Sequence, residues 1–89
     1  MSGNTSLAPN AFGRALRRVR LAAGFSQEQL GLESGVQRNF ISLIETGQNQ
    51  PSITTLFKLA GALGLKASVL IEETEQELAV QKTPRRKTT

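Results

Sequence analysis

Apolar residues recur along the chain with the spacing of α-helices that bury one face. In the first such segment they are Phe12, Leu16, Val19 and Ala23. Intervals of three and four residues place them on one side of a helix, which we expect to begin at Pro9–Asn10 and to end at Gly24. The residues before this helix are mostly small and polar, so we expect residues 1–9 to form a flexible arm.

Two short helices are expected next, joined by a tight turn. Ser26 and Gln29 have the spacing of a capping box, in which each side chain bonds to the backbone of the other residue, so a helix begins here. The pattern is interrupted at Gly35, about two turns later. A third helix is predicted over about Gln37–Thr46, with Gly47 directly after its end.

A fourth helix is expected to begin at Ser52, a good N-cap residue, after a loop over residues 48–51. Gly64 ends it, and its apolar stripe consists of Ile53, Leu56, Leu59, Ala60 and Leu63. Residues Ala67–Ile71 are expected to form the start of a fifth helix. Residues 72–82 favour helix and can prolong it.

These elements describe one small all-α domain. No stretch of the sequence alternates as a strand does, and 89 residues provide room for one core. We therefore predict a compact five-helix domain over residues 10–72. Residues 73–89 follow as a polar extension and a basic tail, because Thr83–Pro84 should end any helix.

The amino-acid composition argues against most kinds of catalytic and metal-binding site. The chain has no Cys and no His, so it has no thiolate or imidazole for a metal site and lacks the commonest general base. It also has no glycine-rich phosphate loop and no carboxylate pair suited to catalysis, so we predict no enzyme activity, no metal and no cofactor. No membrane span or signal peptide is recognisable, and we expect a cytoplasmic protein that does not bind membranes.

The charge distribution favours a polyanionic partner. The net charge is +4, and residues 12–71 hold seven basic side chains against three acidic ones. Neutralising phosphates drives affinity for nucleic acid, so a basic domain suits such a partner. Three arginines on the first predicted helix form either a solvated helix face or a contact with phosphate: Arg14, Arg17 and Arg18. A cluster of four glutamates follows. It either solvates a helix or repels DNA or the acidic surface of a second subunit, and it consists of Glu72, Glu73, Glu75 and Glu77. A second basic group is expected to be a disordered tail rather than a specific contact: Arg85, Arg86 and Lys87.

The segment 27–45, QEQLGLESGVQRNFISLIE, meets the needs of two short helices that cross steeply. Gly31 is small enough for the contact, and Gly35 can adopt a left-handed turn. Four apolar residues lock the second helix down: Leu30, Val36, Ile41 and Ile44. The residues left facing away from the core are then Gln37, Arg38, Asn39, Ser42 and Leu43, whereas Phe40 is expected to pack partly into the core. A helix held in this way fits the major groove of DNA.

With these motifs, Phe12–Glu72 resembles the phage-repressor-like helix-turn-helix family, which includes lambda repressor, Cro and restriction–modification controller proteins. The resemblance rests on SQEQLGLESGV, FISLIETG and PSITTLFKLAGALGL. It implies a lambda-repressor-like DNA-binding domain with the helix-turn-helix at the second and third helices. Gly31 stands where this family usually has Ala.

The resemblance implies roles for particular residues. Base reading falls to Gln37, Arg38 and Asn39, and more weakly to Ser42. Arg suits guanine, and Asn or Gln suits adenine, in bidentate contacts. Phosphate binding falls to Gln27, which also supports the recognition helix, and to the amides and side chains of the loop residues Gln48, Asn49 and Gln50. Arg20 and Glu45 match a structural ion pair that ties the first helix to the end of the third.

The function expected from these features is sequence-specific transcription regulation. Such a protein binds a pseudo-palindromic operator in double-stranded DNA as a homodimer. The dimer surface is expected at Leu65, Val69, Leu70 and Ile71, because a small core cannot bury every apolar residue of the fifth helix. No small-molecule effector domain is expected. The alternative is a protein-interaction module, antitoxin-like or coactivator-like, that keeps the fold without reading DNA.

Overall fold

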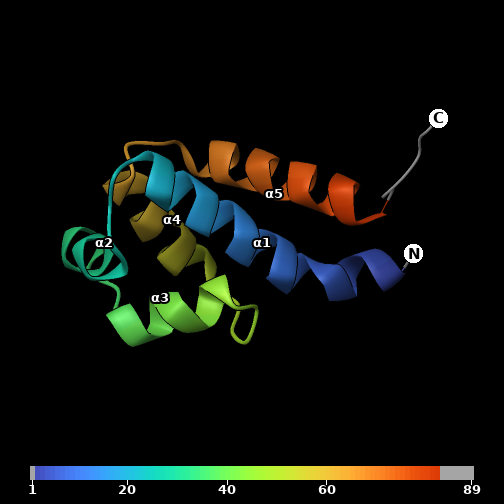
Figure 1. Ribbon diagram of the computed structural model, residues 1–89, viewed down its shortest axis with the longest axis horizontal. Coiled ribbons are helices and arrows are strands. Elements are labelled where there is room, and N and C mark those ends of the chain that lie inside the picture. Colours follow the sequence, from blue (N-terminus) through green and yellow to red (C-terminus); the bar gives the residue numbers. More distant parts are fainter. Residues whose placement is uncertain (1, 83–89) are drawn as a thin grey trace.

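The computed structural model describes residues 2–82, with side chains placed for residues 8–80. Within this range it contains five helices and no strand, which confirms the all-α prediction (Figure 1). The helices are α1 (Ser2–Ala22), α2 (Gln27–Ser34), α3 (Arg38–Glu45), α4 (Ile53–Ala62) and α5 (Ala67–Lys82).

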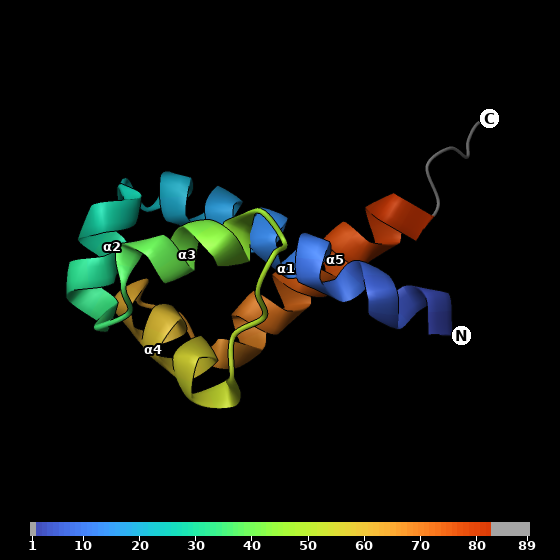
Figure 2. The same ribbon diagram turned by 90° about the horizontal axis from the view of Figure 1, so that it is seen from below.

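Helix α1 is the axis of the fold. It packs against α5 on one side and against α3 on the other, while α2 contacts both α3 and α4 (Figures 1 and 2). Helices α1 and α5 run in opposite directions, so the start of α1 and the end of α5 lie at the same end of the molecule. The core between the helices is mostly aliphatic and comprises Phe12, Leu16, Leu30, Val36, Ile41, Ile44, Leu56, Leu59, Ala60 and Leu70.

The predicted helix ends are confirmed where local signals define them. Ser26 Oγ accepts a hydrogen bond from the Gln29 amide at 3.0 Å, and Gln29 Oε1 accepts one from the Ser26 amide at 2.9 Å. Ser52 Oγ likewise accepts from the Thr55 amide at 3.1 Å and caps α4. Gly35 has φ +77°, the left-handed conformation that the end of α2 requires.

The start of α1 differs from the prediction. The helix begins at Ser2 rather than at Pro9–Asn10, so residues 2–9 are helical where a flexible arm was expected. A proline inside a helix removes a backbone hydrogen bond and crowds the preceding turn. Helix α5 extends to Lys82 beside α1, as its helix-favouring composition allowed. The predicted tail cations Arg85, Arg86 and Lys87 lie outside the described residues.

Backbone contact between α1 and α3 was not predicted and depends on Gly13. A Cβ atom at this position would overlap the carbonyl oxygens of Ile44 and Glu45, the latter at 2.6 Å. No other residue therefore fits here without moving one helix away from the other. The last turn of α3 is in this way seated directly on α1.

Two apolar residues lie where the sequence did not place them. Ile53, predicted to be in the buried stripe of α4, is 68% exposed because it precedes Leu56 by almost one turn and lies beyond the edge of the core. Leu70, predicted at a dimer surface, is 0% exposed because it packs within the core of its own chain.

No single helix in the described part of the chain is long and apolar enough to cross a membrane. Helix α4 and residues 67–80 of α5 meet that test only when taken together, by length and composition, and they are bent by 101° at the break.

Candidate nucleic-acid interface

Helix α3 has two chemically different faces. Its inner residues Ile41 and Ile44 are 0% exposed, while Gln37, Arg38 and Asn39 at its start are exposed to solvent. The side chain of Gln37, the N-cap residue, makes no capping hydrogen bond and remains available for other contacts. In the view of Figure 2, α3 lies across the surface between α2 and the loop that leads to α4.

The remaining predicted positions of α3 are less exposed. Ser42 and Leu43 are half-buried, so Ser42 offers a smaller surface than the three residues at the helix start. Phe40 is half-buried and packs against the core, which confirms the expected packing. The exposed polar surface of α3 is therefore concentrated at its N-terminal end.

The turn between α2 and α3 brings two backbones into contact. A Cβ atom at Gly31 would lie 2.8 Å from the carbonyl oxygen of Val36, and the Gly35 amide donates to the Gly31 carbonyl at 2.9 Å. Gly31 thus serves as the small contact residue that the sequence predicted. A chain with Ala at this position needs a slightly wider turn.

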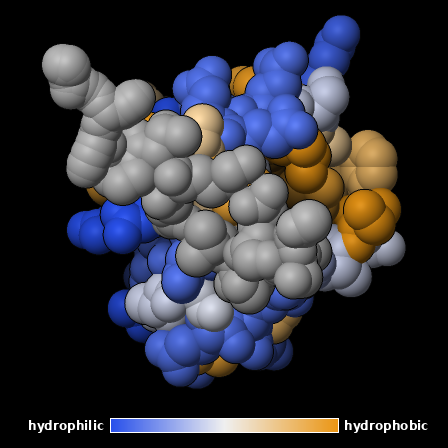
Figure 3. All heavy atoms as spheres, turned by 90° about the vertical axis from the view of Figure 1, so that its right-hand side faces the viewer, coloured by the Kyte–Doolittle hydropathy of each residue, from blue (hydrophilic) through white to orange (hydrophobic). Residues whose placement is uncertain are grey.

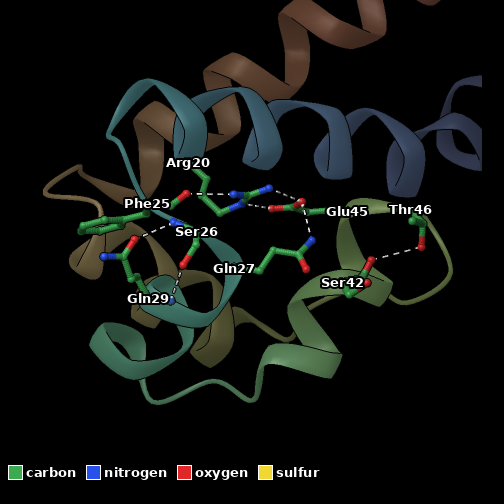
Figure 4. A network of polar contacts seen from close by, with 8 residues as sticks. All are labelled: Arg20, Phe25, Ser26, Gln27, Gln29, Ser42, Glu45 and Thr46. Carbon is green, nitrogen blue, oxygen red and sulfur yellow. Dashed lines mark hydrogen bonds and ion pairs between the residues drawn. The ribbon is translucent and has the colours of Figure 1, made fainter.

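A polar network fixes the other end of α3 (Figure 4). Arg20 Nε donates to Glu45 Oε2 at 2.7 Å and Arg20 Nη2 donates to Glu45 Oε1 at 3.0 Å, which confirms the predicted ion pair. Arg20 Nη1 also donates to the Phe25 carbonyl at 2.8 Å. Since the Arg20 and Glu45 side chains are 8% and 3% exposed, this pair is shielded from water and ties α1 to α3.

Gln27 joins the same network from the first turn of α2. Its Nε2 atom donates to Glu45 Oε1 at 3.0 Å, so the predicted support of α3 is present in the structure. An amide nitrogen carries two hydrogens, and this bond uses one of them.

The loop after α3 is closed by its own backbone. The amides of Gln48 and Asn49 both donate to the Leu43 carbonyl, at 2.9 and 3.2 Å. The expectation that the amides of this loop hold DNA is therefore corrected for these two residues. What the loop presents outward is the exposed side chains of Gln48 and Gln50 and the half-buried Asn49.

The charges on α1 and α5 are paired in a way that the sequence did not reveal. Arg18 Nη1 donates to Glu73 Oε1 at 2.6 Å, and its Nε and Nη2 donate to Glu77 Oε2 at 3.2 and 3.0 Å. The hydrogen bond that Arg18 donates to Glu73 raises the pKa of Arg18 above its ordinary value. Arg18 is thus paired with α5 while its side chain remains 47% exposed, so it stays on a solvated helix face with its charge partly neutralised by the two glutamates. Arg14 and Arg17 are exposed and make no ion pair with another described residue.

The predicted dimer residues divide by exposure. Leu65 and Val69 are half-buried, and Ile71 is 42% exposed. With Leu70 in the core, Ile71 alone among the four offers a large exposed apolar side chain. In the described part of the chain, no group of three His, Cys, Asp or Glu residues is arranged to hold a metal ion.

Known proteins share this arrangement. A helix-turn-helix family model matches residues 16–70. The control protein C.BamHI of Bacillus amyloliquefaciens is 36% identical over 64 residues, which are 71% of this chain and 79% of that protein. Among solved structures, the clp gene regulator ClgR from Corynebacterium glutamicum has a TM-score of 0.81 at 29% identity. The match covers 85% of this chain and 81% of the ClgR chain. The restriction-modification controller protein C.AhdI from Aeromonas hydrophila has a TM-score of 0.68 at 39% identity, and the match covers 70% of this chain and 94% of the C.AhdI chain.

These relatives are named as control or regulator proteins, which agrees with the prediction that the chain has no enzyme activity. The chain belongs to the helix-turn-helix family of DNA-binding transcriptional regulators, the XRE-type group that includes phage repressors and restriction–modification controller proteins.

Proposed function

We propose that the chain regulates transcription by binding a pseudo-palindromic operator in double-stranded DNA as a homodimer, with α3 in the major groove. The observation that carries this proposal is the division of α3 into a locked inner face and an exposed outer start. Ile41, Ile44 and the Arg20–Glu45 pair hold the helix in one orientation. A helix fixed in this way presents its first residues to base edges in a constant register.

The base-reading residues in this proposal are Gln37, Arg38 and Asn39, with Ser42 one turn later. A guanidinium forms a bidentate contact with guanine, and the two amides do so with adenine. Phosphate contacts from Gln27 and the loop side chains of Gln48, Asn49 and Gln50 then set the position of the helix along the DNA, since such contacts carry no sequence information.

The dimer follows from the number of reading elements. One chain offers a single α3, which reaches only one half-site. Two copies related by a two-fold axis place two such helices about 34 Å apart, one turn of DNA. The regulators and controllers among its relatives support a role at specific genes.

Selection of bound sequences from a random DNA pool tests the whole proposal. We expect an enriched motif with two inverted half-sites. Binding that is weak, strongly salt-dependent and without an enriched motif would contradict it, and would favour a protein-interaction module with the same fold.

The selected site then tests Arg38 separately. Arg38→Ala should weaken binding to it by about 1–3 kcal/mol and relax one base position. Gln27→Ala is the matched comparison, because loss of a phosphate contact weakens many sequences alike. Equal losses on selected and random DNA for Arg38→Ala would remove the base-reading role.

A further inference from the structure

Helix α1 carries a line of exposed residues on a side that faces neither the core nor α3. Arg17, Arg18 and Leu21 follow Arg14 by three, four and seven residues, so the four side chains lie along one face of the helix. All four are exposed to solvent, whereas Gly13 is turned toward α3. These four residues form the α1 stripe.

A shallow groove of about 410 Å³ lies between the α1 stripe and α5. Its lining consists of the four stripe residues and Glu77 of α5. Helices α1 and α5 lie side by side and run in opposite directions (Figure 1). In Figure 3, hydrophobic side chains gather toward the side on which α4 lies, whereas the described atoms on the opposite side of that view are mostly hydrophilic. The groove is thus separate from the apolar side chains that are exposed on α4.

The positive charge of the groove is only partly neutralised. Arg18 donates to Glu73 and Glu77 and so connects the two walls of the groove. Helix α1 contains no acidic residue, and Arg14 and Arg17 make no ion pair with another described residue. Two arginines are therefore left to bind anions beside a groove that the third holds together.

Leu21 lies among these arginines and is 56% exposed. A single exposed leucine is ordinary, but the aliphatic stems of neighbouring arginines extend the apolar surface around it. Arginine is also enriched at protein interfaces, because its guanidinium is weakly hydrated and binds a carboxylate through two nitrogens. An apolar spot bordered by unpaired cations is complementary to a partner that carries both carboxylates and a large apolar side chain.

We infer that the groove between the α1 stripe and α5 binds an acidic helical segment of another protein. Carboxylates of that segment bind Arg14 and Arg17, and one of its apolar side chains packs on Leu21. Arg14 and Leu21 are two helical turns apart, about 10 Å, so the partner needs acidic and apolar residues at the same separation. A helix laid into a groove on a protein surface is a common mode of peptide recognition.

Other occupants fit this groove less well. A DNA backbone supplies phosphates to the arginines, but it has no large apolar group to cover the leucine. Residues 83–89, TPRRKTT, are basic and would be repelled. A second copy of the chain could offer Glu28 and Leu32 of α2. These two border a hollow that Gln37 and Arg38 also line, so such pairing would cover the proposed base-reading residues.

Binding at this groove leaves the surfaces of the proposed function free. The proposed base-reading and phosphate-binding residues lie on α2, on α3 with its N-cap residue, and in the loop that follows α3. The predicted dimer residues lie in α5 or just before it, and none of these groups includes a residue of α1. One chain can therefore hold DNA and the acidic partner together, which would bring the partner to the operator.

A labelled synthetic helical peptide tests the groove on the full chain, with fluorescence anisotropy as the measurement. The peptide carries two Glu residues one turn apart and a Leu one turn beyond them. Arg14→Gln and Arg17→Gln should each weaken its binding several-fold, and Leu21→Gln should weaken it by about 10-fold. Lys58→Gln and Leu32→Gln are the matched controls, because they remove an exposed cation and an exposed leucine elsewhere and should leave binding nearly unchanged. All five positions are exposed, so every variant should unfold thermally like the unchanged chain.

The controls and the site of binding decide the outcome. Equal losses for Arg14→Gln and Lys58→Gln would mean attraction by net charge alone, and that result, like a peptide that does not bind, would overturn the proposal. Amide chemical shifts of the chain should change most at residues 14–21 and around Glu77 when the peptide is added. Changes concentrated at the start of α3 would place the peptide on the proposed DNA surface and would also overturn it.

Two further measurements separate a protein partner from DNA and from a second copy. Arg17→Gln should leave the slope of log Kd for DNA against log salt concentration unchanged. A slope reduced by about one unit would assign Arg17 to a phosphate and would overturn the proposal. Self-association of the chain should be the same for Leu21→Gln, and a loss there would assign the groove to a second copy instead. The DNA selection above reports separately whether α3 reads sequence, so the proposed function can fail without this one.

Discussion

The two sides of α1 are held by the same pair of chemical groups in different surroundings. Toward α3, Arg20 binds Glu45 with side chains that are 8% and 3% exposed. Toward α5, Arg18 binds Glu73 and Glu77, but its side chain is 47% exposed. Both arginines use more than one nitrogen, so the geometry of the bonds does not distinguish them.

The difference lies in the cost of breaking each pair. A charge that loses its partner inside a protein is left without water, whereas an exposed charge is solvated again and is screened by salt. The α3 side of α1 should therefore be rigid and intolerant of change, and the α5 side tolerant. This division keeps α3, rather than α5, in one fixed orientation on α1.

Arg20→Met should cause the largest loss of stability. It leaves the Glu45 carboxylate buried with only Gln27 donating to it, and removal of one partner from such a pair costs about 3–5 kcal/mol. Urea unfolding followed by circular dichroism measures this loss. Specific DNA binding should fall with it, because α3 loses one of its attachments to α1.

The control for this prediction removes both charges. In the double variant Arg20→Met, Glu45→Met no buried charge is left unpaired, so its stability should exceed that of Arg20→Met alone. A single variant that loses less than about 1 kcal/mol, the range of exposed ion pairs, would show that the shielding of this pair has little effect.

Gly13→Ala should have the next largest effect. Alanine favours helix by about 1 kcal/mol over glycine, but its Cβ would overlap backbone oxygens of α3 that cannot rotate away. We expect a net destabilisation of about 1–3 kcal/mol, the usual cost of overpacking, measured by the same unfolding experiment.

Gly61→Ala is the matched control for Gly13. It lies within α4 with nothing within 4 Å of an added Cβ, so it should stabilise the domain by up to about 1 kcal/mol. If both substitutions stabilise, then α1 and α3 can separate without cost, and the contact at Gly13 does not position α3.

Sequence rules predicted the fold best where the signals are local. The capping box of Ser26 and Gln29, the left-handed Gly35 and the cap at Ser52 each act within a few residues, and both ends of α2 and the start of α4 follow from them. The Arg20–Glu45 pair was predicted through the family resemblance, because residues 25 apart in sequence give no local signal.

Features that depend on contacts between distant segments were missed. The start of α1 at Ser2 and the ion pairs of Arg18 both need α5 in place, and Arg18 is 55 residues from Glu73. The close approach at Gly13 likewise joins two segments that are distant in sequence, α1 and the end of α3.

The smallest expected effect is on the exposed side of α1. Arg18→Met should lower stability by less than about 1 kcal/mol, because an exposed ion pair gains little and loses part of that gain to ordering and salt. The difference from the unchanged chain should shrink further at high salt, whereas that of Arg20→Met should persist. Arg17→Met is the control: Arg17 is an exposed neighbour without an ion pair to a described residue, so its loss should be smaller still. Hydrogen exchange along α5 should report faster opening of its last turns in Arg18→Met alone. A loss for Arg18→Met equal to that of Arg20→Met would mean that α5 and α3 are held to α1 with the same strength.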